Sequence, residues 1–176
     1  MVDAICGEGM YYLDKPFAFF GHSMGAIVAF EVARQLEKKT GATPAHLVVS
    51  GRRAPQLPSN QPPAFGLPDE EFKEKLERLN GVPKELLLSA ELMSLVLPSI
   101  RSDFEAIETY QYSPGPKLHC PITAFGGFRD SHVSQSSLDA WKEQTTASFK
   151  VRMFPGDHFF IHGAERDVLR MLSKDL

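Results

Sequence analysis

The sequence predicts an α/β fold, namely an open parallel sheet of about four strands with helices on both faces and a helical insertion. Short apolar runs suited to buried strands alternate with helical periodicity before residue 51 and again after residue 116. The stretch between these parts breaks the alternation and is rich in helix formers. A chain of 176 residues suffices for one core, so we expect a single domain over 1–176.

The first part of the chain predicts a strand, a helix and a second strand. The apolar run 17–20 lies between a proline and a glycine, as a buried strand would. A helix is predicted over 24–39, because its apolar side chains recur at helical spacing and a Thr-Gly pair follows as a stop signal. Leu47–Val49 predicts the second strand. This order forms a right-handed parallel unit.

The middle of the chain predicts helices. A proline-rich loop over 52–66 precedes a helix that begins at a proline followed by acids and ends at Gly81. Two more helices are predicted over 86–97 and 98–110. An insertion over 68–110 is a candidate lid over an active site. The alternative is a helical subdomain that only completes the core.

After residue 116 the alternation of strands and helices resumes. Strands are predicted at 122–125 and 149–154, and helices over 136–145 and 164–172. In such sheets, functional residues gather where loops leave the carboxyl ends of the strands. The residues that follow residues 20, 125 and 154 are therefore the first candidates for chemistry.

Composition excludes several classes of function. The formal net charge of −3 argues against nucleic-acid binding, which needs clustered Lys and Arg, and the pair Arg52-Arg53 is read as a solvated surface feature. The two cysteines, Cys6 and Cys120, lack metal-ligand spacing and are expected as buried neutral thiols. The sequence shows neither a membrane span nor a signal peptide, so we expect no membrane partner and a cytoplasmic location.

Gly21-His22-Ser23-Met24-Gly25 matches the pattern G-x-S-x-G between a predicted strand and a predicted helix. That is the context of a nucleophile elbow, in which a sharp turn lifts a serine hydroxyl above the sheet. We expect both glycines to be required, because such a turn leaves little room for a Cβ atom. The helix behind the turn would direct its positive amino end at a developing oxyanion. The alternative is a plain tight turn with a surface serine.

A nucleophilic serine needs a histidine base held by a carboxylate. Asp130 follows the strand at 122–125, and His158 follows the strand at 149–154. The order Ser23, Asp130, His158 is that of the α/β-hydrolases. Three candidates after three different strands predict a Ser-His-Asp site.

The neighbouring polar residues have simpler interpretations. Asp157 is expected as a turn residue because it adjoins His158, and His22 is expected to pack beside the elbow rather than to act as the base. His162 is expected at a helix start, since a metal site with His158 would need acids that are not evident nearby. Two further histidines that precede strands are expected at the surface, namely His46 and His119.

The chain contains the separate motifs "FFGHSMGAIVAFEVARQLE", "HLVVSGRRAPQLP", "LPDEEFKEKLERLNGVP", "RSDFEAIETYQY", "CPITAFGGFRD" and "FPGDHFFI". Together they resemble those of type II thioesterases, which serve nonribosomal peptide and polyketide synthetases. The likeness runs over nearly the whole chain and keeps the motifs in order. Members often carry an acid where Arg129 stands, and we expect this change to alter local charge and leave the triad intact.

The resemblance implies an α/β-hydrolase that releases misloaded or stalled acyl groups from the phosphopantetheine thiol of carrier-protein domains. Ser23 would be the nucleophile, His158 the general base and then acid, and Asp130 the carboxylate that orients it. The backbone N–H of Met24 would donate to the oxyanion, and 68–110 would correspond to the lid. No cofactor is implied beyond the phosphopantetheine that the substrate carries, and the partners would be acyl or peptidyl carrier domains.

The front of the chain departs from the family, whose members have earlier strands and a loop that donates the second oxyanion N–H. Here 16 residues precede Phe17, and 1–15 resemble the end of the family's helix that leads into the nucleophile strand. Loss of one donor slows such chemistry by about 10²- to 10³-fold. The strand at 17–20 would lie at a sheet edge, where another chain could pair. The alternatives are therefore a carrier-binding module with little or no turnover, and a hydrolase of other esters.

Overall fold

The computed structural model describes residues 1–9, 14–59 and 61–176, and the chain divides into two compact units. The first unit, called the sheet body, comprises Met1–Leu57 and Pro114–Leu176. The second, called the helical unit, comprises Pro58–Ser113 and contains the predicted insertion 68–110.

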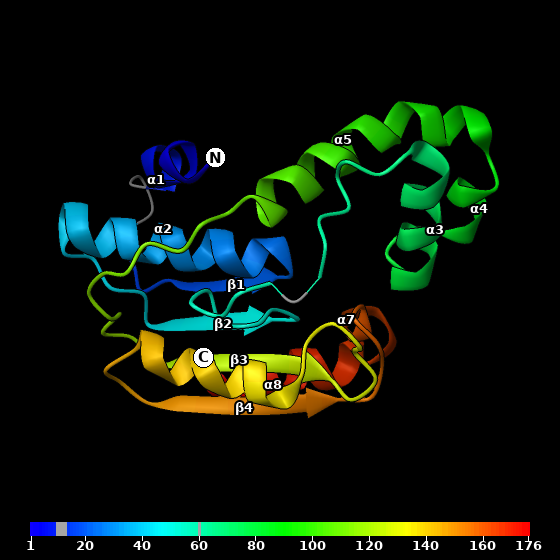
Figure 1. The fold of residues 1–176 in the computed structure, drawn as a ribbon. Coiled ribbons are helices and arrows are strands. Elements are labelled where there is room, and N and C mark those ends of the chain that lie inside the picture. Colours follow the sequence, from blue (N-terminus) through cyan, green and yellow to red (C-terminus); the bar gives the residue numbers. More distant parts are fainter. Residues whose placement is uncertain (10–13, 60) are drawn as a thin grey trace. The chain divides into compact units, whose positions relative to one another are not determined.

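The sheet body is built on four parallel strands that lie side by side in the order β1-β2-β3-β4 (Figure 1). They are β1 (Ala18–His22), β2 (His46–Ser50), β3 (Ile122–Gly127) and β4 (Phe149–Phe154). All residues of β2 and β3 are buried, as expected for interior strands covered on both faces. The predicted parallel α/β sheet is thereby confirmed.

One face of the sheet packs against α2 (Met24–Thr40), and α1 (Val2–Gly9) packs against α2 (Figure 1). Cys6 of α1 and Val32 and Leu36 of α2 form a buried cluster against which Phe17 and Phe19 pack. Farther along this face lie α6 (Gln135–Asp139) and the 3₁₀ helix η2 (Ala140–Gln144). The ring of Trp141 in η2 meets that of Phe30 in α2 edge-on, with 5.3 Å between their centroids.

The opposite face is covered by α7 (Phe160–Gly163) and α8 (Glu165–Asp175). Because side chains alternate along a strand, Val48 points away from α2 and packs with Phe125, Phe154 and Phe160. The end of α8 is fixed by Asp175, whose carboxylate accepts two hydrogen bonds of 2.6 and 2.7 Å from Arg152 of β4. Helices on both faces were predicted and are confirmed.

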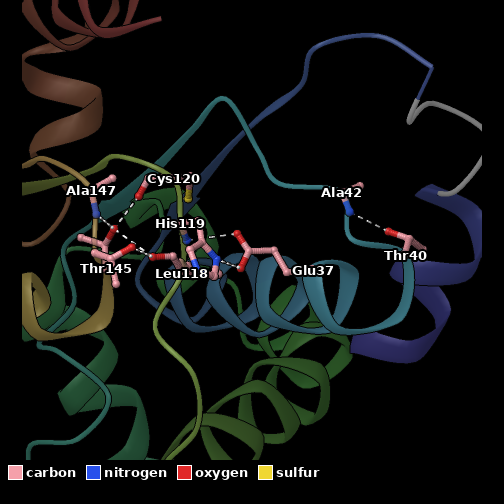
Figure 2. Close-up of polar contacts among 9 residues, drawn as sticks. Glu37, Thr40, Ala42, Leu118, His119, Cys120, Thr145 and Ala147 are labelled. Carbon is pink, nitrogen blue, oxygen red and sulfur yellow. Dashed lines mark hydrogen bonds and ion pairs between the residues drawn. The ribbon is translucent and has the colours of Figure 1, made fainter.

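The end of the sheet opposite to the candidate site is held by side chains that bond to backbone (Figure 2). The Thr145 hydroxyl donates to the carbonyls of Leu118 and Cys120, at 3.2 and 2.7 Å, and accepts from the N–H of Ala147. Glu37 of α2 accepts from the backbone N–H of His119 at 3.2 Å and pairs with its ring. These contacts join α2 and the segment after η2 to the start of β3.

The helical unit contains α3 (Asp69–Leu79), α4 (Lys84–Leu87) and α5 (Ala90–Glu108) around a core of its own. Phe72 and Leu76 of α3 pack with Met93 and Leu97 of α5. The carboxylate of Glu108 accepts from the N–H groups of Ala64 and Phe65, at 2.7 and 2.9 Å.

Arg101 completes this arrangement of the helical unit. Its guanidinium donates to the carbonyls of Phe65 and Leu67 and to the Asp69 carboxylate, and it lies 4.4 Å from the centre of the Phe72 ring. Arg101 and Glu108 together are called the clasp. Both reach from α5 to the loop before α3, so they fasten the start of α3 to α5.

Four details differ from the sequence prediction. The predicted break at Pro98 is wrong, because α5 runs through it; Pro98 is exposed, so the Ser94 carbonyl that lacks an N–H donor can bind water. The predicted helix 136–145 is part α-helix and part 3₁₀ helix. The last predicted helix, 164–172, corresponds to α8, and the short helix α7 before it was not predicted. His46, expected at the surface, is buried and shares a 2.8 Å hydrogen bond with Thr123.

β1 ends the strand order, and one large apolar side chain on it is half-exposed, namely Phe20 at 43%. The pairing of another chain along this edge stays a prediction. Among the described residues, no helix is long and apolar enough to cross a membrane.

Candidate active site

The motif at 21–25 forms a sharp turn from β1 into α2. Ser23 lies between the two elements with φ 52° and ψ −113°, a backbone conformation that residues other than glycine rarely adopt. Its N–H donates to the Ser50 carbonyl at 2.7 Å, and its own carbonyl accepts from Ala26 at 3.1 Å. The strained turn is thus held by β2 on one side and by the first turn of α2 on the other.

The two glycines of the motif have different roles. A Cβ atom at Gly21 would lie 2.0 Å from the carbonyl oxygen of Gly25, so no other residue fits there. At Gly25 a Cβ would meet nothing within 4 Å. The expectation that the turn requires both glycines is therefore wrong for Gly25. Its carbonyl oxygen instead explains why position 21 must be a glycine.

The loops after β3 and β4 are bonded to each other, which brings Asp130 and His158 together. The N–H of Phe128 donates to the Phe154 carbonyl and that of Arg129 donates to the Gly156 carbonyl, both at 2.8 Å. A Cβ at Gly127 would lie 2.4 Å from the carbonyl oxygen of Asp157. This glycine allows the close approach of the two loops, and its role was not foreseen from the sequence.

Ser23, His158 and Asp130 form a continuous chain of hydrogen bonds. His158 Nδ1 lies 2.8 Å from Asp130 Oδ2, and His158 Nε2 lies 3.0 Å from Ser23 Oγ. Because the carboxylate accepts the Nδ1 proton, Nε2 carries a lone pair toward the serine hydroxyl. The geometry is that of a serine activated by a histidine base.

The environment keeps Asp130 ionised. Its side chain is 0% exposed and that of His158 is 11% exposed. Burial alone would raise the pKa of Asp130, but the hydrogen bond from His158 and the 2.9 Å bond from the His132 N–H hold that pKa below its usual value. An ionised carboxylate in this place fixes the imidazole tautomer and favours the imidazolium that forms when the ring takes a proton.

The other residues that the sequence analysis singled out are Met24, Asp157 and His162. Met24 is the first residue of α2, so its N–H has no partner within the helix. Asp157 accepts from the Phe159 N–H at 3.0 Å, as a turn residue does. His162 belongs to the end of α7 rather than to its start, and the described part of the chain contains no cluster of acids, histidines or cysteines suited to a metal.

The buried Ser50 and the half-buried His22 form a pair next to the site that the sequence did not single out as a pair. His22 Nδ1 and the Ser50 hydroxyl share a 2.9 Å hydrogen bond, and the His22 ring centre lies 5.2 Å from that of His158. Burial, followed by the neighbouring His158, lowers the pKa of His22 to about 4. His22 is therefore neutral near pH 7, and it packs beside the elbow.

Comparison with known proteins extends these observations. The thioesterase domain model matches residues 1–176. The gramicidin S biosynthesis protein GrsT of Aneurinibacillus migulanus is 45% identical over all of this chain, which spans 69% of GrsT.

Two solved structures share the fold. RedJ, a thioesterase from the prodiginine pathway of Streptomyces coelicolor, superposes with a TM-score of 0.90 at 37% identity over 99% of this chain and 66% of its own. The type II thioesterase BorB of the borrelidin cluster superposes with a TM-score of 0.86 at 36% identity, over 99% of this chain and 72% of its own. The chain thus spans about two thirds of these proteins. By its sequence and by its α/β-hydrolase fold, the chain belongs to the thioesterase family.

Proposed function

We propose that this chain hydrolyses acyl thioesters through a Ser-His-Asp mechanism, and that its substrates are acyl groups on the phosphopantetheine thiol of carrier-protein domains. The observation that carries the proposal is the chain of hydrogen bonds from Ser23 Oγ through His158 to Asp130, at 3.0 and 2.8 Å. A serine on a strained elbow, with a base and a buried carboxylate in line, suits acyl transfer.

In the first half of the reaction, Ser23 Oγ attacks the thioester carbonyl carbon while its proton passes to His158 Nε2. The carbonyl oxygen becomes an oxyanion, for which the N–H of Met24 and the amino end of α2 are the proposed stabilising groups. The carbon–sulfur bond then breaks. The leaving thiolate takes the proton from His158, and the acyl group stays on Ser23 as an oxygen ester.

In the second half, a water molecule gives its proton to His158 Nε2 and attacks the acyl-serine carbonyl carbon. The second oxyanion collapses, the bond to Ser23 Oγ breaks, and the serine regains the proton from His158. The products are the free carboxylic acid and the carrier thiol. Asp130 stays ionised throughout and stabilises the imidazolium formed in each half.

The carrier domain as partner is supported by the relatives. BorB is described as a type II thioesterase of a biosynthetic cluster, and GrsT as a protein of gramicidin S biosynthesis. The proposed role is the release of misloaded or stalled acyl groups, with the helical unit as the lid over the acyl chain. In support of a lid, the helical unit exposes three leucines, namely Leu92 and Leu95 on α5 and Leu88 in the turn before it. The cytoplasm stays a prediction from the sequence.

The test is release of a radiolabelled acyl group from a loaded carrier domain, compared between the wild type and Ser23→Ala. We expect release by the wild type and a loss of about 10⁶-fold in kcat for the variant. The matched control is Ser136→Ala, which removes an exposed serine hydroxyl from α6.

The outcomes separate the alternatives. Equal release by the wild type and Ser23→Ala would overturn the proposed mechanism. Binding of the carrier without turnover by either form would favour a binding module. Faster hydrolysis of simple oxygen esters than of carrier thioesters would contradict the proposed substrate class.

A further inference from the structure

The ring of His22 is enclosed by the two segments that carry the nucleophile and the base. His22 precedes Ser23 at the end of β1, and its ring centre lies 5.2 Å from that of His158, at an interplanar angle of 48°. The rings of Phe159 and Phe160 lie at 5.6 and 5.8 Å. The His22 ring thus fills the space between the elbow and the turn that presents His158.

The end of β2 closes the other side of this space. The Ser50 hydroxyl anchors His22 Nδ1 at 2.9 Å, and Ser50 is fully buried. Gly51 has φ +61°, and a Cβ there would lie 2.6 Å from Cε1 of His22. Gly51 therefore leaves room for the His22 imidazole, and the hydrogen bond from the adjacent Ser50 fixes the position of the ring.

We propose that His22 is a positioning residue: its ring, held by Ser50, supports the His158 imidazole in the orientation that faces both Ser23 and Asp130. The inference rests on the proposed function, because it concerns the base of that mechanism. His158 is held at its two nitrogens by hydrogen bonds within its ring plane, and these bonds leave the tilt of the ring to be set by packing. His22 supplies a contact on the ring itself.

The position suits a neutral ring. The charged or titratable groups that act on His22 are His158, His162 and Asp130, and burial is the largest influence on its pKa. When His158 takes the serine proton, it becomes a cation beside His22. A second cation at that place would oppose the proton transfer, whereas a neutral imidazole does not.

The experiment compares three variants by kcat and KM for a loaded carrier. His22→Asn keeps a polar atom for Ser50 but removes the ring, and His22→Phe keeps a ring but removes the hydrogen bond. His119→Asn is the matched control, because His119 is exposed at the opposite end of the sheet body.

We expect His22→Asn to lower kcat by about 10- to 100-fold with little change in KM, since a small displacement of the base has effects of this order. His22→Phe should recover part of that loss, and His119→Asn should match the wild type. A merely structural role would instead reduce the folded fraction and leave kcat per folded molecule unchanged.

A second measurement does not need turnover. The proton shared by His158 Nδ1 and Asp130 gives a downfield ¹H NMR resonance, which should shift or broaden in His22→Asn and stay unchanged in His119→Asn. Unchanged kcat per folded molecule in His22→Asn, or an unchanged resonance, would overturn the inference. If Ser23→Ala were as active as the wild type, the proposed function would fail, and the resonance would still test the contact between the two rings.

Discussion

The sheet body and the helical unit are each stabilised by a different kind of internal contact. In the body, side chains from strands far apart in the sequence share one core, for example Val48, Phe125 and Phe154. In the helical unit, two neighbouring helices share a smaller core, and the partly exposed clasp of Arg101 and Glu108 fastens the loop before α3. The body therefore has a fixed geometry, whereas the helical unit combines its smaller core with polar contacts near water.

The two units also differ in charge and in titratable groups. All six histidines lie in the sheet body, which has 12 acidic and 14 basic residues. The helical unit has no histidine and has 10 acidic and 5 basic residues. Chemistry near neutral pH therefore belongs to the body, and the helical unit contributes apolar surface and negative charge.

The variant with the largest expected effect, Asp130→Asn, tests whether catalysis depends on the fixed geometry of the body. Asp130→Asn keeps the size of the side chain but presents an amide that can donate to His158 Nδ1, which favours the wrong tautomer. We expect kcat to fall by about 10⁴-fold. The measurement is acyl release from a loaded carrier at pH 7.

Asp157→Asn is the matched control for that variant. Asp157 is an adjacent acid on the same loop as His158, and an asparagine can still accept from the Phe159 N–H. We expect its kcat to stay within a few-fold of the wild type. Equal losses for the two variants would show that the loop, rather than the orienting carboxylate, carries the effect.

The second effect concerns stability in acid, where the body should respond before the helical unit. The folded chain holds the pKa of His22 near 4, whereas the ordinary value is 6.5. Between these values the unfolded chain takes up a proton and the folded chain does not, so stability falls as the pH drops from 6.5 to about 4. The free energy of unfolding lost through His22 is about 3 kcal/mol at most. The folded chain lowers the pKa of Asp130 from 3.8, so protonation of this carboxylate reduces stability only at still lower pH.

Urea unfolding followed by Trp141 fluorescence measures this dependence, because Trp141 is fully buried in the body. His46, whose pKa burial also lowers, adds a loss of the same sign. The pH slope should therefore decrease, but not vanish, in His22→Phe. An equal slope in this variant and in the wild type would contradict the assignment to His22.

Much of the body could be predicted from the sequence, because its signals are local. Buried parallel strands are continuous apolar runs, and a serine between β1 and α2 has a recognisable pattern. The G-x-S-x-G pattern, the places of the candidates after three strands, and the order Ser23, Asp130, His158 together identified three residues that the fold brings within hydrogen-bonding distance.

The remaining features depend on contacts between distant segments. His46 resembles a surface residue in the sequence, but it is buried because its ring finds Thr123 on the neighbouring strand. Gly127 is required by the carbonyl of Asp157, and Gly51 by the ring of His22. These neighbours come from other strands or loops, so no local sequence pattern predicts these contacts.

The smallest expected effect tests whether the helical unit opens independently of the body. Glu108→Ala leaves the N–H groups of Ala64 and Phe65 without their carboxylate acceptor, which costs about 1–3 kcal/mol. Hydrogen exchange followed by mass spectrometry should show faster exchange in α3 and α5 and unchanged exchange in β2 and β3. Glu105→Ala is the control, since it removes an exposed carboxylate from the same helix. Faster exchange in β2 and β3 as well would show that the two units unfold together, and the contrast between them would then fail.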